Sequence, residues 1–184
     1  MIKTTYKITV IFALMSIISC KEKEQPRKPI SYSSGEYIKE SIQRNKEFVS
    51  EEEQLILDYI KKDSTLQYKE STAGFWFSYI QKNEKDTIKI QSGDVVQLDY
   101  KIENFENQLI YDFQQTQPKE YVVDKQEVVS GLRNAVKGMR TNEEIKCLLP
   151  STMAYGSVGD KNKIGANTPI IMTIKVKSIK KNNE

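Results

Sequence analysis

The chain has 184 residues, of which 38% are hydrophobic and 29% charged, enough to bury the core of about one domain. Its 28 basic and 25 acidic residues nearly balance, and it contains two cysteines and no histidine. The absence of histidine excludes Ser-His and Cys-His nucleophiles, histidine-ligated metals and a histidine general base. We expect no metal and no cofactor; the lack of histidine itself means only that any catalysis has to proceed without the usual proton shuttle.

Residues 1–19 have the pattern of an export signal. A short basic segment precedes an apolar run at 8–18, which is shorter than the about 20 residues needed to span a bilayer core. The run ends at Ser19-Cys20, and residues 17–20 resemble the lipobox of bacterial lipoproteins. That resemblance implies a lipoprotein signal peptide and lipidation of Cys20. The chain would then be lipid-anchored to a bacterial membrane in the cell envelope, facing the periplasm or the cell exterior. The alternative is an ordinary secretory signal that ends near a cysteine.

The segment after the signal has the composition of a solvated tether. Residues 20–35 contain Pro26, Pro29 and a Ser-Tyr-Ser-Ser-Gly cluster with few apolar residues. Subtracting the two signal lysines, Lys3 and Lys7, from the 28 basic residues leaves 26 against 25 acids. So small a net charge, without a basic stripe interleaved with aromatic residues, argues against nucleic acid as a partner.

Residues 36–70 are predicted to form a helical arm of two helices. Residues 36–48 carry a sparse apolar face, and Ser50 with Glu53 matches a capping box, which predicts a second helix start. Apolar residues then recur at helical spacing until residues 63–64. One hypothesis is an arm for client binding or for a homodimer through residues 36–63. The alternative, which we favour, is an amphipathic pair that packs on its own domain.

Residues 71–184 are predicted to form one domain with a sheet. The apolar period changes from 3.6 to 2, which indicates strands at 75–80, 95–102, 107–111, 144–149 and 170–176. Cys147 lies on the apolar side of its strand and is expected to be a buried core thiol. Only one short helix is predicted between the strands, at 132–139. Many strands around one helix indicate an α+β fold with an antiparallel sheet, and not a nucleotide-binding βαβ fold.

Within residues 88–180, several motifs resemble those of the FKBP-type peptidyl-prolyl isomerases and occur in the same order. They lie at residues 93–100, 110–112, 125–131, 136–140 and 149–156, followed by Ile164 in a loop that ends at Pro169. With the lipobox and the aromatic segment at 74–79, the whole chain is similar to the FKBP-like lipoproteins associated with bacterial gliding motility. The resemblance implies an antiparallel half-barrel sheet wrapped on one short helix and preceded by the helical arm.

The resemblance also implies a function, peptidyl-prolyl cis-trans isomerisation of X-Pro bonds in proline-containing exported polypeptides. The amide barrier of about 18–20 kcal/mol falls in a dry aromatic pocket, because the twisted amide has less charge separation than the planar one. This reaction needs no nucleophile, metal or proton transfer. The alternative is a non-catalytic periplasmic chaperone or a scaffold lipoprotein that uses the same pocket for binding.

By the same resemblance, the expected site residues are Tyr100, Tyr111, Asp112, Val128, Val129, Leu132, Tyr155, Ile164 and Met172. Tyr155 would donate its hydroxyl to a substrate carbonyl, and Asp112 would orient polar groups at the rim. Leu132 and Met172 stand where the family usually has aromatic residues, which makes the floor of the pocket smaller and less rigid.

Overall fold

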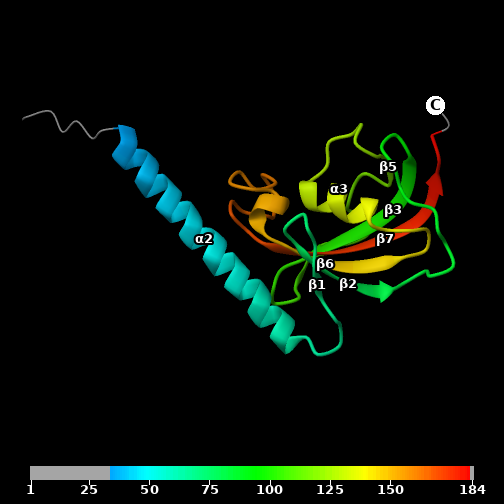
Figure 1. Ribbon diagram of the computed structural model, residues 1–184, viewed down its shortest axis with the longest axis horizontal. Helices are drawn as coiled ribbons and strands as arrows, with labels where there is room; N and C mark the ends of the chain where they lie inside the picture. The colour runs from blue at the N-terminus through cyan, green and yellow to red at the C-terminus, as the bar shows by residue number, and fades with distance from the viewer. Residues whose placement is uncertain (1–33, 183–184) are drawn as a thin grey trace, which may run out of the picture. The chain divides into compact units, whose positions relative to one another are not determined.

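The computed structural model describes residues 34–182. The predicted signal, the lipidation site Cys20 and most of the tether lie outside the described residues. The elements are α2 (Ser34–Lys62), β1 (Lys69–Glu70), β2 (Trp76–Gln81), β3 (Val95–Glu103), β4 (Leu109–Tyr111), β5 (Glu120–Val122), α3 (Ser130–Lys137), β6 (Glu144–Leu149), the 3-10 turn η1 (Ser151–Met153) and β7 (Ile170–Lys180) (Figure 1). None of the helices in the described part is long and apolar enough to cross a membrane.

All strands belong to one antiparallel sheet of order β1-β2-β6-β7-β3-β4, and β5 also pairs with β3. The long strands β3 and β7 form its centre, where Tyr100 lies opposite Ile174. This architecture confirms the predicted α+β class with an antiparallel sheet and one short helix. The sequence did not predict β1 or β5, which are two and three residues long.

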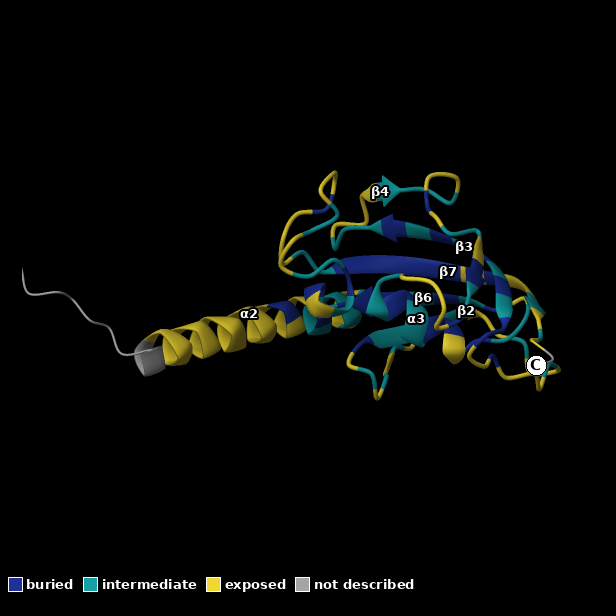
Figure 2. Ribbon diagram, turned by 90° about the horizontal axis from the view of Figure 1, so that it is seen from above, coloured by how far each residue is buried: buried dark blue, intermediate teal, exposed yellow. Residues whose placement is uncertain are grey.

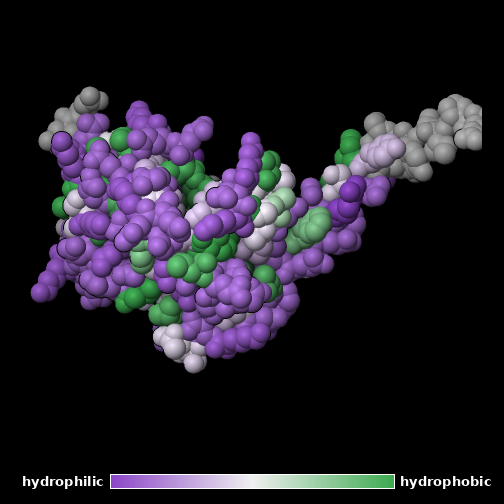
Figure 3. Space-filling model, turned by 180° about the vertical axis from the view of Figure 1, so that it is seen from behind, coloured by the Kyte–Doolittle hydropathy of each residue, from purple (hydrophilic) through white to green (hydrophobic). Residues whose placement is uncertain are grey.

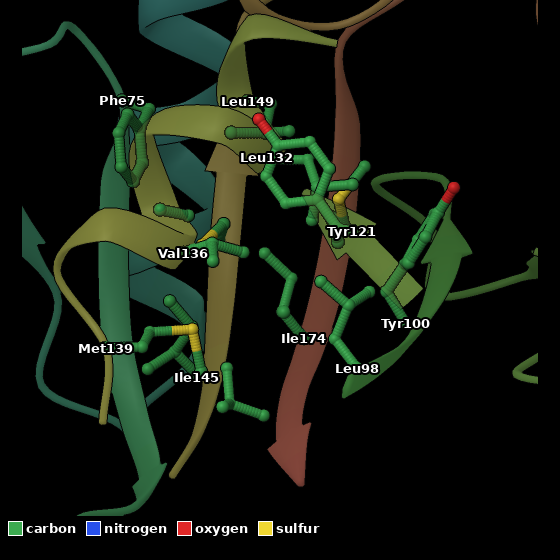
Figure 4. Close-up of a cluster of buried hydrophobic side chains, with 14 of the residues drawn as sticks. Phe75, Leu98, Tyr100, Tyr121, Leu132, Val136, Met139, Ile145, Leu149 and Ile174 are labelled. Atoms are coloured by element: carbon green, nitrogen blue, oxygen red, sulfur yellow. The ribbon is translucent and has the colours of Figure 1, made fainter. Parts of the chain in front are cut away.

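Helix α3 covers the inner face of the sheet and closes the main core. Its residues Leu132 and Val136 face Leu98, Ile145 and Ile174 from three strands (Figure 4). The helix approaches β6 closely because residue 131 is glycine. A Cβ atom at Gly131 would lie 2.5 Å from Cδ1 of Leu149 and 2.8 Å from the backbone oxygen of Met153. Any larger residue would push the start of α3 away from the segment after β6.

Cys147 lies in this core, as the alternation on its strand predicted. The residue is fully buried, and its thiol is free. Burial raises the pKa of the Cys147 thiol well above its ordinary value, so the sulfur stays protonated. Its role is therefore that of a small apolar core residue.

The arm contains one continuous helix, so the predicted pair of helices is wrong. Ser50 lies inside α2 and not at a helix start. The capping-box pattern fails here because no Gly or Pro near Ser50 interrupts the helix, and strong helix formers follow it at residues 51–53. The helix ends at Lys62, where the Asp63 carboxylate accepts hydrogen bonds from the amide and the hydroxyl of Thr65.

The C-terminal half of α2 packs on the outer face of the sheet. Ile56 is completely buried in a small cluster with Leu148 of β6 and Ile171 of β7. One turn earlier, the carboxylate of Glu52 accepts a hydrogen bond from the backbone N–H of Ser151, at 2.8 Å. Most of the remaining helix surface is exposed (Figure 2). The arm therefore contributes to the core of the domain through a short stretch around Ile56.

Asp94 connects the start of β3 to the chain beyond β7. It is 1% exposed, and its carboxylate accepts hydrogen bonds from the amides of Gln91 and Asn182 at 2.7 and 3.0 Å. It also forms an ion pair with Lys181 at 2.6 Å. Burial alone would raise the pKa of Asp94, but the bonds to Lys181, Gln91 and Asn182 outweigh it and hold the pKa below its ordinary 3.8.

We expect Asp94→Asn to lower the free energy of unfolding at pH 7 by about 1.5–3 kcal/mol, the contribution of hydrogen bonds to a buried charge. Because the folded-state pKa is depressed, this stability is present above pH 3.8. It is lost as the pH falls through that value and then through the folded pKa. Urea denaturation at pH 7 and pH 3 tests this, with Glu84→Gln, whose side chain is 79% exposed, as the control. An unchanged pH dependence in Asp94→Asn would contradict the assignment.

Candidate functional site

A cavity of about 480 Å³ opens beside the start of α3. Its walls come from β3, the segment after β4, the segment before α3, the first turn of α3 and the segment after η1. The lining residues are Tyr100, Gln117, Glu127, Val128, Val129, Leu132, Arg133 and Tyr155. The structure thus brings together five of the nine predicted site residues, which are Tyr100, Val128, Val129, Leu132 and Tyr155.

Tyr100 and Leu132 form the apolar interior of this cavity. Leu132 is almost fully buried at the start of α3, where the close approach of Gly131 to β6 holds it. The Tyr100 hydroxyl donates to the backbone oxygen of Gln117, and the hydroxyl of Thr116 donates to the backbone oxygen of Tyr100. Burial raises the pKa of Tyr100 to about 12, so its hydroxyl is neutral at pH 7. These two bonds fix segment 116–117 against β3.

Tyr155 provides a free hydrogen-bond donor in the site. Its ring is half-buried, and among the described residues its hydroxyl has no hydrogen-bond partner. Burial raises the pKa of Tyr155 above its ordinary value, and the nearby Tyr100, Asp160 and Tyr111 raise it further. The hydroxyl therefore keeps its proton and can donate it in a hydrogen bond to a carbonyl placed in the cavity.

Ile164 and Met172 lie in the core and not among the residues that line the cavity. Both are almost fully buried within the main cluster, which also packs against Tyr111 and Tyr155. Met172 is paired with Ile102 of β3 and with Cys147 of β6. We infer that these two residues support the walls of the site from the core side.

Asp112 and Tyr111, at the end of β4, also lie outside the set that lines the cavity. The Asp112 carboxylate accepts hydrogen bonds from the amides of Gln114 and Gln115, at 2.8 and 3.0 Å. It therefore caps the turn after β4. The structure places no pocket tyrosine on this carboxylate, whereas the Tyr111 hydroxyl donates to Oδ2 of Asp160 at 2.5 Å.

Asp160 organises the loop between η1 and β7. Its Oδ1 accepts hydrogen bonds from the amides of Asn162 and Ile164, each at 2.8 Å. Burial alone would raise the pKa of Asp160, but the bonds to Tyr111, Ile164 and Asn162 lower it, so the group is charged at neutral pH. One carboxylate thus joins the loop that carries Ile164 to the end of β4. Sequence reasoning missed this residue, although Asp160 with Asn162 after Gly159 is a typical turn signal.

We expect Asp160→Ala to release this loop. Loss of hydrogen bonds to a charged acceptor, worth about 1.5–3 kcal/mol, should raise amide hydrogen exchange at Asn162 and Ile164 by about 10- to 100-fold. Exchange measured by NMR tests this, with Asp112→Ala as the matched control, because that carboxylate caps a different turn. Unchanged protection at Ile164 in Asp160→Ala would contradict the assignment.

Comparison with known proteins identifies the family. Residues 86–177, half of the chain, match the family model described as FKBP-type peptidyl-prolyl cis-trans isomerase. The chain belongs to this family. The match contains every residue that lines the cavity, and it agrees with the family that the ordered motifs predicted.

Three similar proteins are 18–28% identical to this chain. An FK506-binding protein 2A from Rhizopus delemar is 28% identical over 108 residues, which cover 55% of this chain. The chain spans 62% of the length of that fungal protein. Two crystal structures share the fold. A peptidyl-prolyl cis-trans isomerase from Pseudomonas syringae pv. tomato has a TM-score of 0.60 and 20% identity, covering 74% of this chain and 96% of its own. FkpA from Escherichia coli has a TM-score of 0.58 and 18% identity, covering 95% of this chain and 82% of its own.

Three polar residues that line the cavity were not predicted from the sequence. They are Gln117, Glu127 and Arg133. Glu127 and Arg133 each lie beside a predicted pocket residue, so adjacency to the motif was a usable signal. Gln117 gave no such signal. It lies 17 residues from Tyr100 in the sequence, and only the fold brings the two together.

Proposed function

We propose that this chain is a peptidyl-prolyl cis-trans isomerase that acts on X-Pro bonds of exported polypeptides. The observation that carries the proposal is the unpaired hydroxyl of Tyr155 in a cavity whose other walls include Tyr100 and Leu132. Family membership supports it, since the match to residues 86–177 encloses the cavity.

The geometry fits a reaction that only rotates a bond. The apolar walls would hold the proline ring and exclude water, which disfavours the planar, charge-separated amide more than the twisted one. The hydroxyl of Tyr155 would fix a neighbouring carbonyl by a hydrogen bond. No bond to carbon breaks and no proton is transferred, so neutral side chains suffice.

The direct test is NMR exchange spectroscopy on a short peptide with one X-Pro bond. We expect the purified protein to accelerate cis/trans exchange above the buffer rate, and Tyr155→Phe to reduce but not abolish the acceleration. Exchange at the buffer rate with the wild-type protein would overturn the proposal.

We further propose that the protein acts in the cell envelope, anchored through Cys20, on clients that include proteins supporting gliding motility. The lipobox-like end of the predicted signal and the similarity to gliding-associated lipoproteins support this setting. Cys20→Ser should move the protein from the membrane to the soluble fraction, and unchanged membrane association would contradict the anchor. Normal gliding in cells that carry only Tyr155→Ala would contradict the role in motility.

A second candidate function is supported by the surface of α2. Apolar side chains are exposed along this helix and interrupt its hydrophilic surface (Figure 3); they include Ile42, Phe48, Val49 and Leu55. Such a surface suits a chaperone that holds unfolded clients, or a homodimer through residues 36–63. Ile42→Ser with Val49→Ser should weaken suppression of client aggregation or shift the sedimentation coefficient to that of a monomer. If neither changes, the surface serves neither role.

A further inference from the structure

Arg133 brings a positive charge to the wall of the cavity and forms no ion pair among the described residues. It follows Leu132 in the first turn of α3 and lines the same space. Its Nε atom is buried and has no hydrogen-bond partner in the described part of the chain. Leaving a buried polar nitrogen unpaired is costly, and the described residues do not satisfy the full hydrogen-bonding capacity of this guanidinium.

The acidic residues nearest in sequence form no direct ion pair with Arg133. Asp124 is paired with Lys137 at 2.7 Å. Glu127 lines the cavity but is exposed, and it forms no ion pair with Arg133 in the described residues. The charge of Arg133 still reaches Asp124, where it contributes to the lowered pKa of that carboxyl. Arg133 therefore lines a cavity whose remaining walls, Glu127 apart, are uncharged.

The cavity has room for more than a proline ring. Its volume of about 480 Å³ lies in the range of about 300–1,000 Å³ that holds drug-sized ligands. Leu132 and Arg133 line the same cavity, so a client whose proline ring lies over Leu132 would bring a neighbouring residue into the space that Arg133 lines. The planar guanidinium donates two parallel hydrogen bonds to a carboxylate, which suits it to Asp and Glu side chains.

We propose that Arg133 makes the site selective for prolines that have an acidic residue next to them in the client. This inference rests on the proposed isomerase function and names its substrate class. Arg133 is then a specificity-determining residue: it contacts the flanking carboxylate, while Tyr155 and the apolar walls act on the prolyl bond itself.

The test uses two matched peptide pairs on the purified full-length protein. In one pair the residue before proline is Glu or Gln, and in the other the residue after proline is Glu or Gln. NMR exchange gives kcat/KM for each peptide. We expect wild type to prefer Glu over Gln at least threefold in one pair, Arg133→Lys to keep part of the preference and Arg133→Gln to lose it. The control Lys125→Gln removes a nearby exposed charge that does not line the cavity, and it should keep the preference.

Equal Glu-to-Gln ratios in wild type and Arg133→Gln would overturn the proposal. An equal loss of the Glu-over-Gln preference in Lys125→Gln would also overturn the proposal. The preference would then come from the overall electrostatic field of the surface and not from Arg133. If no peptide is isomerised, the proposed isomerase function is wrong, and this outcome alone does not decide the role of Arg133. The ratio of Kd values for the Glu and Gln peptides, measured by calorimetry in wild type and Arg133→Gln, then decides the role of Arg133.

Discussion

Replacing Tyr155 by alanine should lower kcat/KM for prolyl isomerisation at least about tenfold, a loss of about 1.4 kcal/mol of transition-state stabilisation. The ring of Tyr155 is one wall of the cavity, so its removal admits water to the site and also deletes the free hydroxyl. Both changes act on the twisted amide more than on the ground state. NMR exchange on an X-Pro peptide gives the rate, and urea denaturation checks that the variant is folded.

The matched variant Tyr155→Phe separates the two contributions. It keeps the wall and removes one hydrogen bond, worth about 0.5–1.5 kcal/mol, so kcat/KM should fall by about two- to tenfold. If Tyr155→Ala has the wild-type rate, Tyr155 is not part of the site. If Phe is as damaging as Ala, the hydroxyl carries the whole effect.

The largest effect on stability should come from Ile56→Ala, which we expect to cost about 2–5 kcal/mol of unfolding free energy. Ile56 is completely buried between α2 and the outer face of the sheet, so its truncation leaves a cavity against Leu148 and Ile171. Urea denaturation measures the loss.

Ile42→Ala is the control, because the same residue type is 50% exposed on the same helix. Its effect should stay within about 0.5 kcal/mol. Equal effects of the two substitutions would mean that α2 does not pack on the sheet in solution.

The sequence predicted the features that depend on local periodicity or on ordered motifs. The strand around Tyr100 shows its buried face by simple alternation, and the motifs place Val128, Leu132 and Tyr155 in a common pocket. The capping-box prediction at Ser50 failed because the same local pattern is compatible with the interior of a helix.

Contacts between distant segments could not be predicted from one sequence. The bond between Tyr111 and Asp160 joins residues 49 positions apart, and the bond between Glu52 and Ser151 spans 99. Neither residue of either pair belongs to a pattern that identifies its partner. The unpaired state of Arg133 is likewise visible only once its neighbours are placed.

The hydrogen bond from the Ser151 amide to Glu52 joins the segment matched by the family model to a residue of α2 that lies before it. The family match begins at residue 86, yet the amide of Ser151, four residues before Tyr155, depends on an acceptor 34 residues upstream of that boundary. A chain shortened to the family region would lose this acceptor, and it would expose Leu148 and Ile171 to water. The folded unit of this chain is therefore longer than the segment that the family model matches, and it includes the C-terminal end of α2.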